Sequence, residues 1–270
     1  FENVHHRIDE EKNVVTLGRN IPRRFFQAAA FLIAFLGTTW MIYQAFIPGS
    51  IFSQYQVYQT GDEIKEVTLP DNSTVVMNHQ SSIVYHKKMN KRPAREVRLT
   101  GEAYFNITQN KEKPFKIRAG ASLTTVLGTS FNINAYQHSN RVQLTVNTGR
   151  VEFLDTESQQ NEILEPGEKG ILEITHDSNA VGLKKLSNDD VNFLSWYSKD
   201  LMFNQTPLSQ VAQKLEEVYH VPIEFSTDEI KQKKLTANFK DEDITTIFEV
   251  IELTFSIRIE QLEGKWVAFE

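Results

Sequence analysis

An uncharged apolar run near the start of the sequence constrains its fold more than any other feature. The run spans 23 residues, from Phe25 to Ile47. A helix of this length measures about 35 Å at ~1.5 Å per residue, which is enough to cross a hydrocarbon core of ~30 Å. A buried core helix is the alternative, but such a helix normally has a polar face. The run therefore predicts a single transmembrane helix over residues 25–47.

The charges on either side of this run predict the orientation of the helix. The first basic residue after the run is Lys65, whereas five precede it: Arg7, Lys12, Arg19, Arg23 and Arg24. Because basic residues concentrate on the cytoplasmic side of a span, we expect the N-terminus in the cytoplasm and the larger C-terminal part outside. The run is too long for a cleaved signal peptide. Pro48 and Gly49 mark the helix exit and the start of a juxtamembrane linker over residues 48–62.

Composition and motifs exclude several classes of function. A net charge of −6 disfavours nucleic-acid binding, which needs concentrated Lys and Arg. The absence of cysteine excludes disulfides, thiol catalysis and cysteine-ligated metals. The sequence has no HExxH, GxSxG or phosphate-loop pattern, so we expect no enzyme, no cofactor and no metal site. Five histidines are expected at the surface or in turns: His79, His86, His138, His176 and His220.

Residues 63–186 read as an all-β domain, because apolar and polar residues alternate in a series of short runs. A period of two is typical of strands with one buried face. The alternating positions are Val97/Leu99, Phe105/Ile107, Phe115/Ile117/Ala119, Phe131/Ile133/Ala135, Val142/Leu144/Val146 and Val151/Phe153. No stretch long enough for a helix interrupts them, so we expect a compact or solenoid-like β domain.

An internal repeat with an offset of 36 residues organises the end of the chain, after a short linker helix predicted over residues 187–199. The matching pairs are Phe203/Phe239, Leu208/Ile244, Val211/Ile247, Leu215/Ile251, Tyr219/Phe255, Val221/Ile257 and Ile223/Ile259. Each copy reads strand, helix, strand, and residues 265–269 add a closing strand. We therefore expect a small α+β domain with duplicated βαβ units over residues 200–270.

Six segments between residues 64 and 170 resemble, in order and spacing, the FecR-like anti-sigma regulators. They are LPDNSTVVMNHQSSIVY, REVRLTGEAYFNI, KPFKIRA, VLGTSFNINAY, VQLTVNTGRVEF and LEPGEKG. The chain departs from the family at Asn72, where glycine is usual, and at Asn147, which is often hydrophobic. The resemblance implies an inner-membrane regulator that acts with a TonB-dependent outer-membrane transporter.

The duplicated C-terminal unit resembles the short domain shared by secretins and the N-terminal signalling region of TonB-dependent receptors. FecR-like regulators of the Bacteroidetes type end in a similar domain. Here His220 stands where glycine is common. The resemblance also implies a sigma-binding region before the membrane helix. Residues 1–24 are expected to be the cytoplasmic remnant of that region.

The Gly128–Thr129 peptide bond is the candidate site of self-processing. Some FecR-like proteins cleave themselves at a Gly-Thr in this motif, by attack of the threonine hydroxyl on the preceding carbonyl. The reaction needs a strained peptide and a free hydroxyl. The alternative is a turn glycine followed by an ordinary strand residue. Glu102 and Glu168 lie beside other turn glycines, and no catalytic carboxylate pair is expected from them.

A basic cluster is the remaining charged feature, formed by Lys87, Lys88, Lys91, Arg92 and Arg95. It predicts a solvated hairpin, or else a contact with anionic lipid or an acidic partner.

The sequence as a whole predicts a membrane-anchored signal relay. We expect an inner-membrane anti-sigma regulator with periplasmic C-terminal domains. Its partners would be the signalling domain of a TonB-dependent transporter, the inner membrane, and a cytoplasmic extracytoplasmic-function sigma factor that binds an N-terminal region of which residues 1–24 are expected to hold only a small part. The alternative is a membrane-anchored envelope scaffold or assembly protein, because secretin-type βαβ domains also serve as oligomerisation units.

Overall fold

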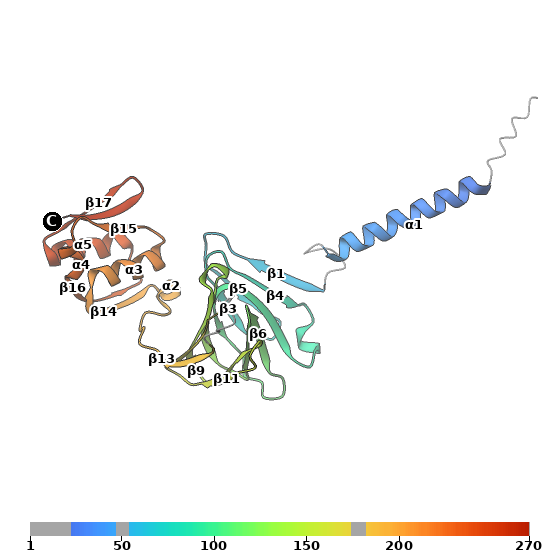
Figure 1. Ribbon diagram of the computed structural model, residues 1–270, viewed down its shortest axis with the longest axis horizontal. Helices are drawn as coiled ribbons and strands as arrows, with labels where there is room; N and C mark the ends of the chain where they lie inside the picture. Colours follow the sequence, from blue (N-terminus) through green and yellow to red (C-terminus); the bar gives the residue numbers. More distant parts are fainter. Residues whose placement is uncertain (1–22, 47–53, 174–181, 270) are drawn as a thin grey trace, which may run out of the picture. The chain divides into compact units, whose positions relative to one another are not determined.

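The computed structural model describes residues 23–46, 54–173 and 182–269, and it divides into the units Phe1–Ser53 and Gln54–Glu270 (Figure 1). The described part of the first unit is the helix α1 (Arg23–Phe46), whose side chains are described and exposed over residues 30–43. Across the described parts of the chain, no helix combines the length and apolar character needed to cross a membrane. The transmembrane assignment therefore stays a prediction. Most of the predicted cytoplasmic remnant lies outside the described residues.

The second unit begins with a 13-stranded sheet. Its strands are β1 (Tyr55–Gln59), β2 (Lys65–Thr68), β3 (Thr74–Met77), β4 (Ser82–His86), β5 (Arg95–Asn106), β6 (Phe115–Ala119), β7 (Ser122–Val126), β8 (Ser130–Ala135), β9 (Arg141–Thr148), β10 (Val151–Asp155), β11 (Asn161–Leu164), β12 (Glu168–Glu173) and β13 (Lys184–Ser187). Short 3₁₀ turns interrupt it at η1 (Met89–Lys91) and η2 (Gln137–Ser139). Residues 55–59, expected in the juxtamembrane linker, instead form β1, which pairs with β4.

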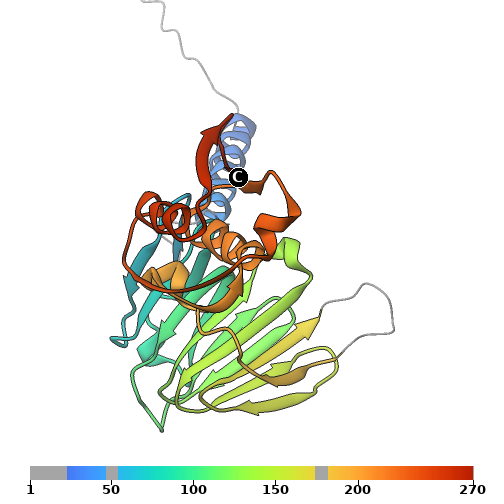
Figure 2. The same cartoon turned by 90° about the vertical axis from the view of Figure 1, so that its left-hand side faces the viewer.

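The sheet has two layers, which the long strand β5 connects (Figure 2). One layer contains β1, β4, β6, β7, β10 and β11, and the other contains β2, β3, β8, β9, β12 and β13. The first half of β5 pairs with β4 and β6, and its second half pairs with β3 and β8. Gly101 lies where the pairing changes, at a φ of 89°. A side chain there would meet the backbone of Ser81, since an added Cβ would lie 2.8 Å from Ser81 Cα. Glycine thus allows one strand to serve both layers.

One apolar core fills the space between the two layers. Every alternating position predicted from the sequence is buried in it, which confirms the period-two interpretation. Phe105 and Phe131 stack at its centre with their ring centroids 5.4 Å apart. The sheet is nearly closed and barrel-like, with mostly antiparallel pairing, so the compact alternative is correct and the solenoid-like one is wrong.

The C-terminal part of the second unit is a small α+β domain. Its elements are α2 (Ser195–Ser198), β14 (Asp200–Pro207), α3 (Leu208–Tyr219), β15 (Ile223–Phe225), α4 (Asp228–Gln232), β16 (Lys234–Lys240), α5 (Ile244–Phe255), β17 (Arg258–Leu262) and β18 (Lys265–Phe269). Two copies of strand, helix, strand follow one another, as the repeat predicts. The strands form a β14–β16 pair and a β15–β18–β17 sheet.

The structure explains the three departures from the family pattern. Two of them have left-handed backbone, and the third makes side-chain hydrogen bonds. Asn72 has a φ of 65° and His220 a φ of 55°, so both occupy positions at which glycine is favourable. His220 ends α3, and Ser256 ends α5 in the same left-handed conformation 36 residues later. Asn147 donates hydrogen bonds from Nδ2 to Tyr104 and Ser130. The two helix ends show that the repeat extends to the backbone conformation of its turns.

Candidate partner-binding site

The Gly128–Thr129 bond lies between β7 and β8. Gly128 is absent from the residues with left-handed φ, and an added Cβ would lie 2.5 Å from Gln109 Cα. Close backbone packing therefore explains this glycine without backbone strain. The Thr129 carbonyl accepts a hydrogen bond from the Ile107 amide at 2.9 Å. The Thr129 hydroxyl is buried and has no hydrogen-bond partner among the described residues.

Self-processing at this bond stays a prediction. The unpartnered Thr129 hydroxyl meets one of its two requirements, whereas Gly128 does not show the left-handed backbone strain that would meet the other. Attack of Oγ1 on the Gly128 carbonyl would exchange the peptide bond for an ester, which water then hydrolyses. We expect the purified wild-type chain to give two bands on a denaturing gel, and Thr129→Ala to give one. Thr124→Ala, which removes another buried and unpartnered hydroxyl, is the control and should still give two. A single full-length band from the wild type would contradict self-processing.

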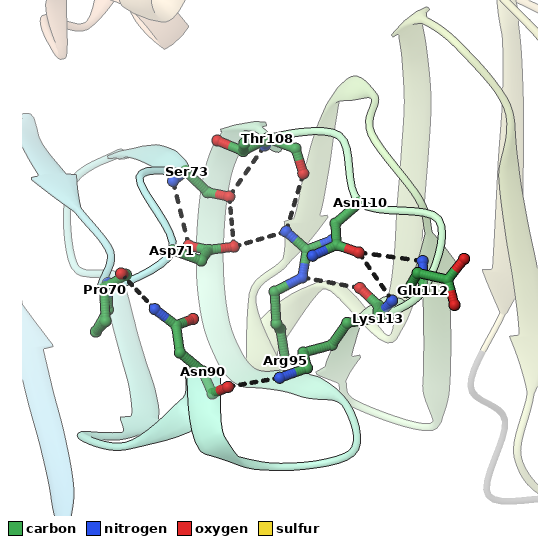
Figure 3. Close-up of polar contacts among 9 residues, drawn as sticks. All are labelled: Pro70, Asp71, Ser73, Asn90, Arg95, Thr108, Asn110, Glu112 and Lys113. Carbon is green, nitrogen blue, oxygen red and sulfur yellow. Dashed lines mark hydrogen bonds and ion pairs between the residues drawn. The ribbon is translucent and has the colours of Figure 1, made fainter.

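Arg95 is the main error in the predicted basic cluster. The sequence places it in a solvated hairpin, but its side chain is only 2% exposed and forms an ion pair with Asp71 at 2.8 Å. Figure 3 shows its guanidinium among three loops, which carry Asp71, Asn90 and the residues from Thr108 to Lys113. Nη1 also donates to the Thr108 carbonyl at 2.9 Å, and Nε donates to the Lys113 carbonyl at 3.0 Å. The remaining cluster residues, such as Lys88 and Lys91, are exposed as predicted.

The Arg95 network joins the three loops in one arrangement. Asp71 in the β2–β3 turn also accepts hydrogen bonds from the Ser73 amide and hydroxyl, and that hydroxyl accepts from the Thr108 amide (Figure 3). A polar pocket of about 250 Å³ opens beside these loops. Because Arg95 and Asp71 neutralise each other, we interpret this cluster as structural.

Glu102 is another buried charged group that the sequence did not reveal. It is 9% exposed and lies on β5. Its carboxylate accepts hydrogen bonds from Asn78 Nδ2 at 2.8 Å and from Asn132 Nδ2 at 2.7 Å. Burial raises the pKa of Glu102, while the two amide donors oppose that change. Glu168, by contrast, has a lowered pKa, because it pairs with Lys185.

Glu102 makes stability depend on pH in a defined direction. Because its folded pKa lies above the unfolded value of about 4.3, the folded state binds more protons between these two values. The free energy of unfolding should therefore fall as pH rises from about 4.3 through the raised pKa. We expect Glu102→Gln to flatten this dependence in urea titrations, whereas Glu96→Gln, at an exposed position on the same strand, should leave it unchanged. Equal slopes for Glu102→Gln and wild type would contradict the assignment.

Among the residues that the structure describes, no group of three or more His, Asp or Glu side chains could hold a metal. His86 corrects one prediction, because it is buried and bonds Gln54 Oε1 through Nε2 at 2.9 Å. His176 lies outside the described residues.

Two glutamates close strand edges in the C-terminal domain, one in each copy of the repeat. Glu216 on α3 accepts a hydrogen bond from the Ile223 amide at 2.6 Å, at the start of β15. Glu252 on α5 accepts one from the Ile259 amide at 2.5 Å, near the start of β17. Each carboxylate accepts the hydrogen bond of an outward N–H group that could otherwise pair with another strand. The sequence contained this signal as a second pair of residues 36 positions apart.

Comparison with known proteins agrees with this architecture. Residues 56–152 match the family model described as FecR protein, and residues 200–267 match the model described as FecR, C-terminal. No curated protein is significantly similar to the chain.

Two crystal structures, at 2.50 Å and 1.65 Å resolution, are similar to the chain. Both are of a protein from Parabacteroides distasonis ATCC 8503 that is proposed to be an anti-sigma factor. Each has 28% sequence identity and a TM-score of 0.59, and the match covers 80% of this chain and 99% of the other. The two matched models together cover most of the β domain and the C-terminal domain, so the chain belongs to the FecR-like family of anti-sigma factors.

Proposed function

We propose that this anti-sigma regulator relays the state of a TonB-dependent outer-membrane transporter to a cytoplasmic extracytoplasmic-function sigma factor. The observation that carries the proposal is the duplicated βαβ domain at the end of the chain, which matches the C-terminal FecR model. A small domain with open strand edges can receive a partner by strand addition. The transporter's N-terminal signalling domain is the partner we assign to it.

Membrane anchoring by α1 is the second part of the proposal. α1 contains 24 residues, and its described side chains are exposed, with large apolar groups among them: Phe31, Leu32, Ile33, Phe35, Leu36, Trp40, Met41 and Ile42. Exposed apolar side chains on all sides of a helix favour contact with lipid or another protein. We assign the N-terminal side to the cytoplasm and the two C-terminal domains to the periplasm, from the basic residues before the helix.

Pull-down of the full tagged chain from detergent-solubilised envelopes of its source cell tests the relay. We expect mass spectrometry to identify a TonB-dependent transporter. Deletion of residues 200–270 should remove the transporter, because the receiving domain is lost. Deletion of residues 1–22 is the matched control, and it should leave recovery of the transporter unchanged.

The same experiment distinguishes the scaffold alternative. Recovery of further copies of this chain with cell-wall assembly proteins, and of neither a transporter nor a sigma factor, would replace the relay with a structural role. Retention of the transporter after deletion of residues 200–270 would contradict the assignment of that domain as the receiver.

A further inference from the structure

The four strand edges of the C-terminal domain are not equally available to a partner. β15 has three residues, and its first outward N–H group bonds Glu216. On the outer edge of β17, the Ile259 N–H group is bonded to Glu252. Among the described residues of this edge, only Gln261, further along, keeps its outward backbone groups open. Short edges and capped groups are the means by which proteins prevent unwanted strand pairing.

The outer edge of β14 is closed by side chains along its length. The Asn192 side chain makes both hydrogen bonds that a neighbouring strand would make at Met202. Its Nδ2 donates to the Met202 carbonyl at 2.9 Å, and its Oδ1 accepts from the Met202 amide at 2.8 Å. The Asp200 amide bonds Ser198 Oγ, and the Asn204 amide bonds Thr206 Oγ1. The N–H and C=O groups of Met202 point away from β16. Its neighbours Leu201 and Phe203 therefore make the backbone hydrogen bonds to β16.

Among the described strands of this domain, β16 has the longest open edge. Asn238 lies opposite Met202, and Lys240 lies opposite Asp200, so the register directs the backbone groups of Asn238 and Lys240 away from β14. Among the described residues no other strand pairs with β16, and these outward groups have no partner. With seven residues, β16 is also longer than β15 or β17.

The side chains of β16 determine what kind of strand fits this edge. Leu235 and Phe239 face the apolar core of the domain, whereas Lys234 and Lys240 are exposed on the other face and form no ion pair with a described residue. A second β16 would bring its own lysines to this edge, where like charges destabilise pairing. A strand with apolar residues on one face and Asp or Glu on the other would match both faces.

We propose that the β16 edge, with its outward backbone at Asn238 and Lys240, binds an acidic amphipathic strand of a partner protein. This inference rests on the proposed function in one respect, since the signalling domain of the transporter is the partner that would provide the strand. Backbone hydrogen bonds provide the affinity, and Lys234 and Lys240 provide the preference for acidic side chains.

Photocrosslinking in the source cell tests the edge independently of the transporter. The full chain carries p-benzoylphenylalanine at Asn238 or, as the control, at Gln261. We expect Asn238 to crosslink to an extended segment of another protein with alternating Asp or Glu residues, and Gln261 to give no such product. A crosslink from Asn238 to a second copy of this chain, a crosslink from Gln261 alone, or no crosslink to another protein would each overturn the proposal.

Asn238→Pro provides the second measurement. The Asn238 N–H group points away from β14, so proline removes an outward donor and blocks strand addition without breaking a β14–β16 bond. In a pull-down without the crosslinker, we expect recovery of the partner identified by crosslinking to fall by about tenfold or more for Asn238→Pro, with unchanged circular dichroism. Gln261→Pro should leave this recovery unchanged. Equal recovery with Asn238→Pro and wild type would overturn the edge assignment. If the partner proves not to be a transporter, the edge assignment stands and the proposed relay fails.

Discussion

Replacement of Arg95 by methionine is expected to lower the free energy of unfolding by about 3–5 kcal/mol, because it leaves the buried Asp71 carboxylate without its cation. Asp71 is 6% exposed, so water would replace the guanidinium poorly. The Thr108 and Lys113 carbonyls would lose their donors as well. Urea unfolding of the purified chain, followed by circular dichroism, measures the change.

Two further variants separate the ion pair from the shape of the guanidinium. Arg95→Lys keeps the charge, but a lysine ammonium lacks the planar guanidinium that donates to two carbonyls and a carboxylate at once. We therefore expect this variant to be destabilised too. Lys88→Met, at an exposed position of the same hairpin, should change the free energy by less than about 0.5 kcal/mol. The structural role assigned to Arg95 would be wrong if Arg95→Met and Lys88→Met were equally stable.

Replacement of Gly101 by alanine is expected to have the second large effect, about 2–5 kcal/mol, because it combines backbone strain with a steric clash. The φ of 89° is unfavourable for a residue with a side chain. The added Cβ would also lie 2.4 Å from Ser81 Oγ and 2.8 Å from Ser81 Cα. Relief of that contact requires movement of the backbone where β5 passes between the two layers.

Two other glycines separate these contributions. Gly167 has a similar φ of 83° and no atom within 4 Å of an added Cβ, so Gly167→Ala should show strain alone, about 1–2 kcal/mol. Gly128 has the close contact without left-handed φ, so Gly128→Ala should show the clash alone, about 1–3 kcal/mol. Urea midpoints that place Gly167→Ala at or below the stability of Gly101→Ala would refute the steric argument.

Local patterns predicted the parts of the fold that depend on which face of an element is buried. The period-two positions from Val97 to Phe153 all lie in the core, because a strand can bury only one set of alternate residues in a half-buried sheet. The 36-residue repeat likewise predicted two βαβ copies. It extends further than the apolar residues, since Glu216 and Glu252 cap matching strands.

The candidate sites were less predictable, because their residues act through distant neighbours. Arg95 reads as one of five basic residues in a hairpin, yet its acceptors lie 13 to 24 positions away in other loops. Glu102 reads as a turn carboxylate, whereas its donors come from Asn78 and Asn132. No local period identifies such partners.

The sequence by itself determined the uncharged 23-residue run, the β character of the central region, the duplicated C-terminal unit and the family. Only the tertiary structure decided that β5 serves two layers, that Arg95 is buried, that Tyr55–Gln59 joins the sheet, and that β16 keeps an open edge. The reason is physical. Side-chain alternation depends on the backbone geometry of a single strand, whereas strand neighbours, buried ion pairs and capped edges depend on which distant segments pack together.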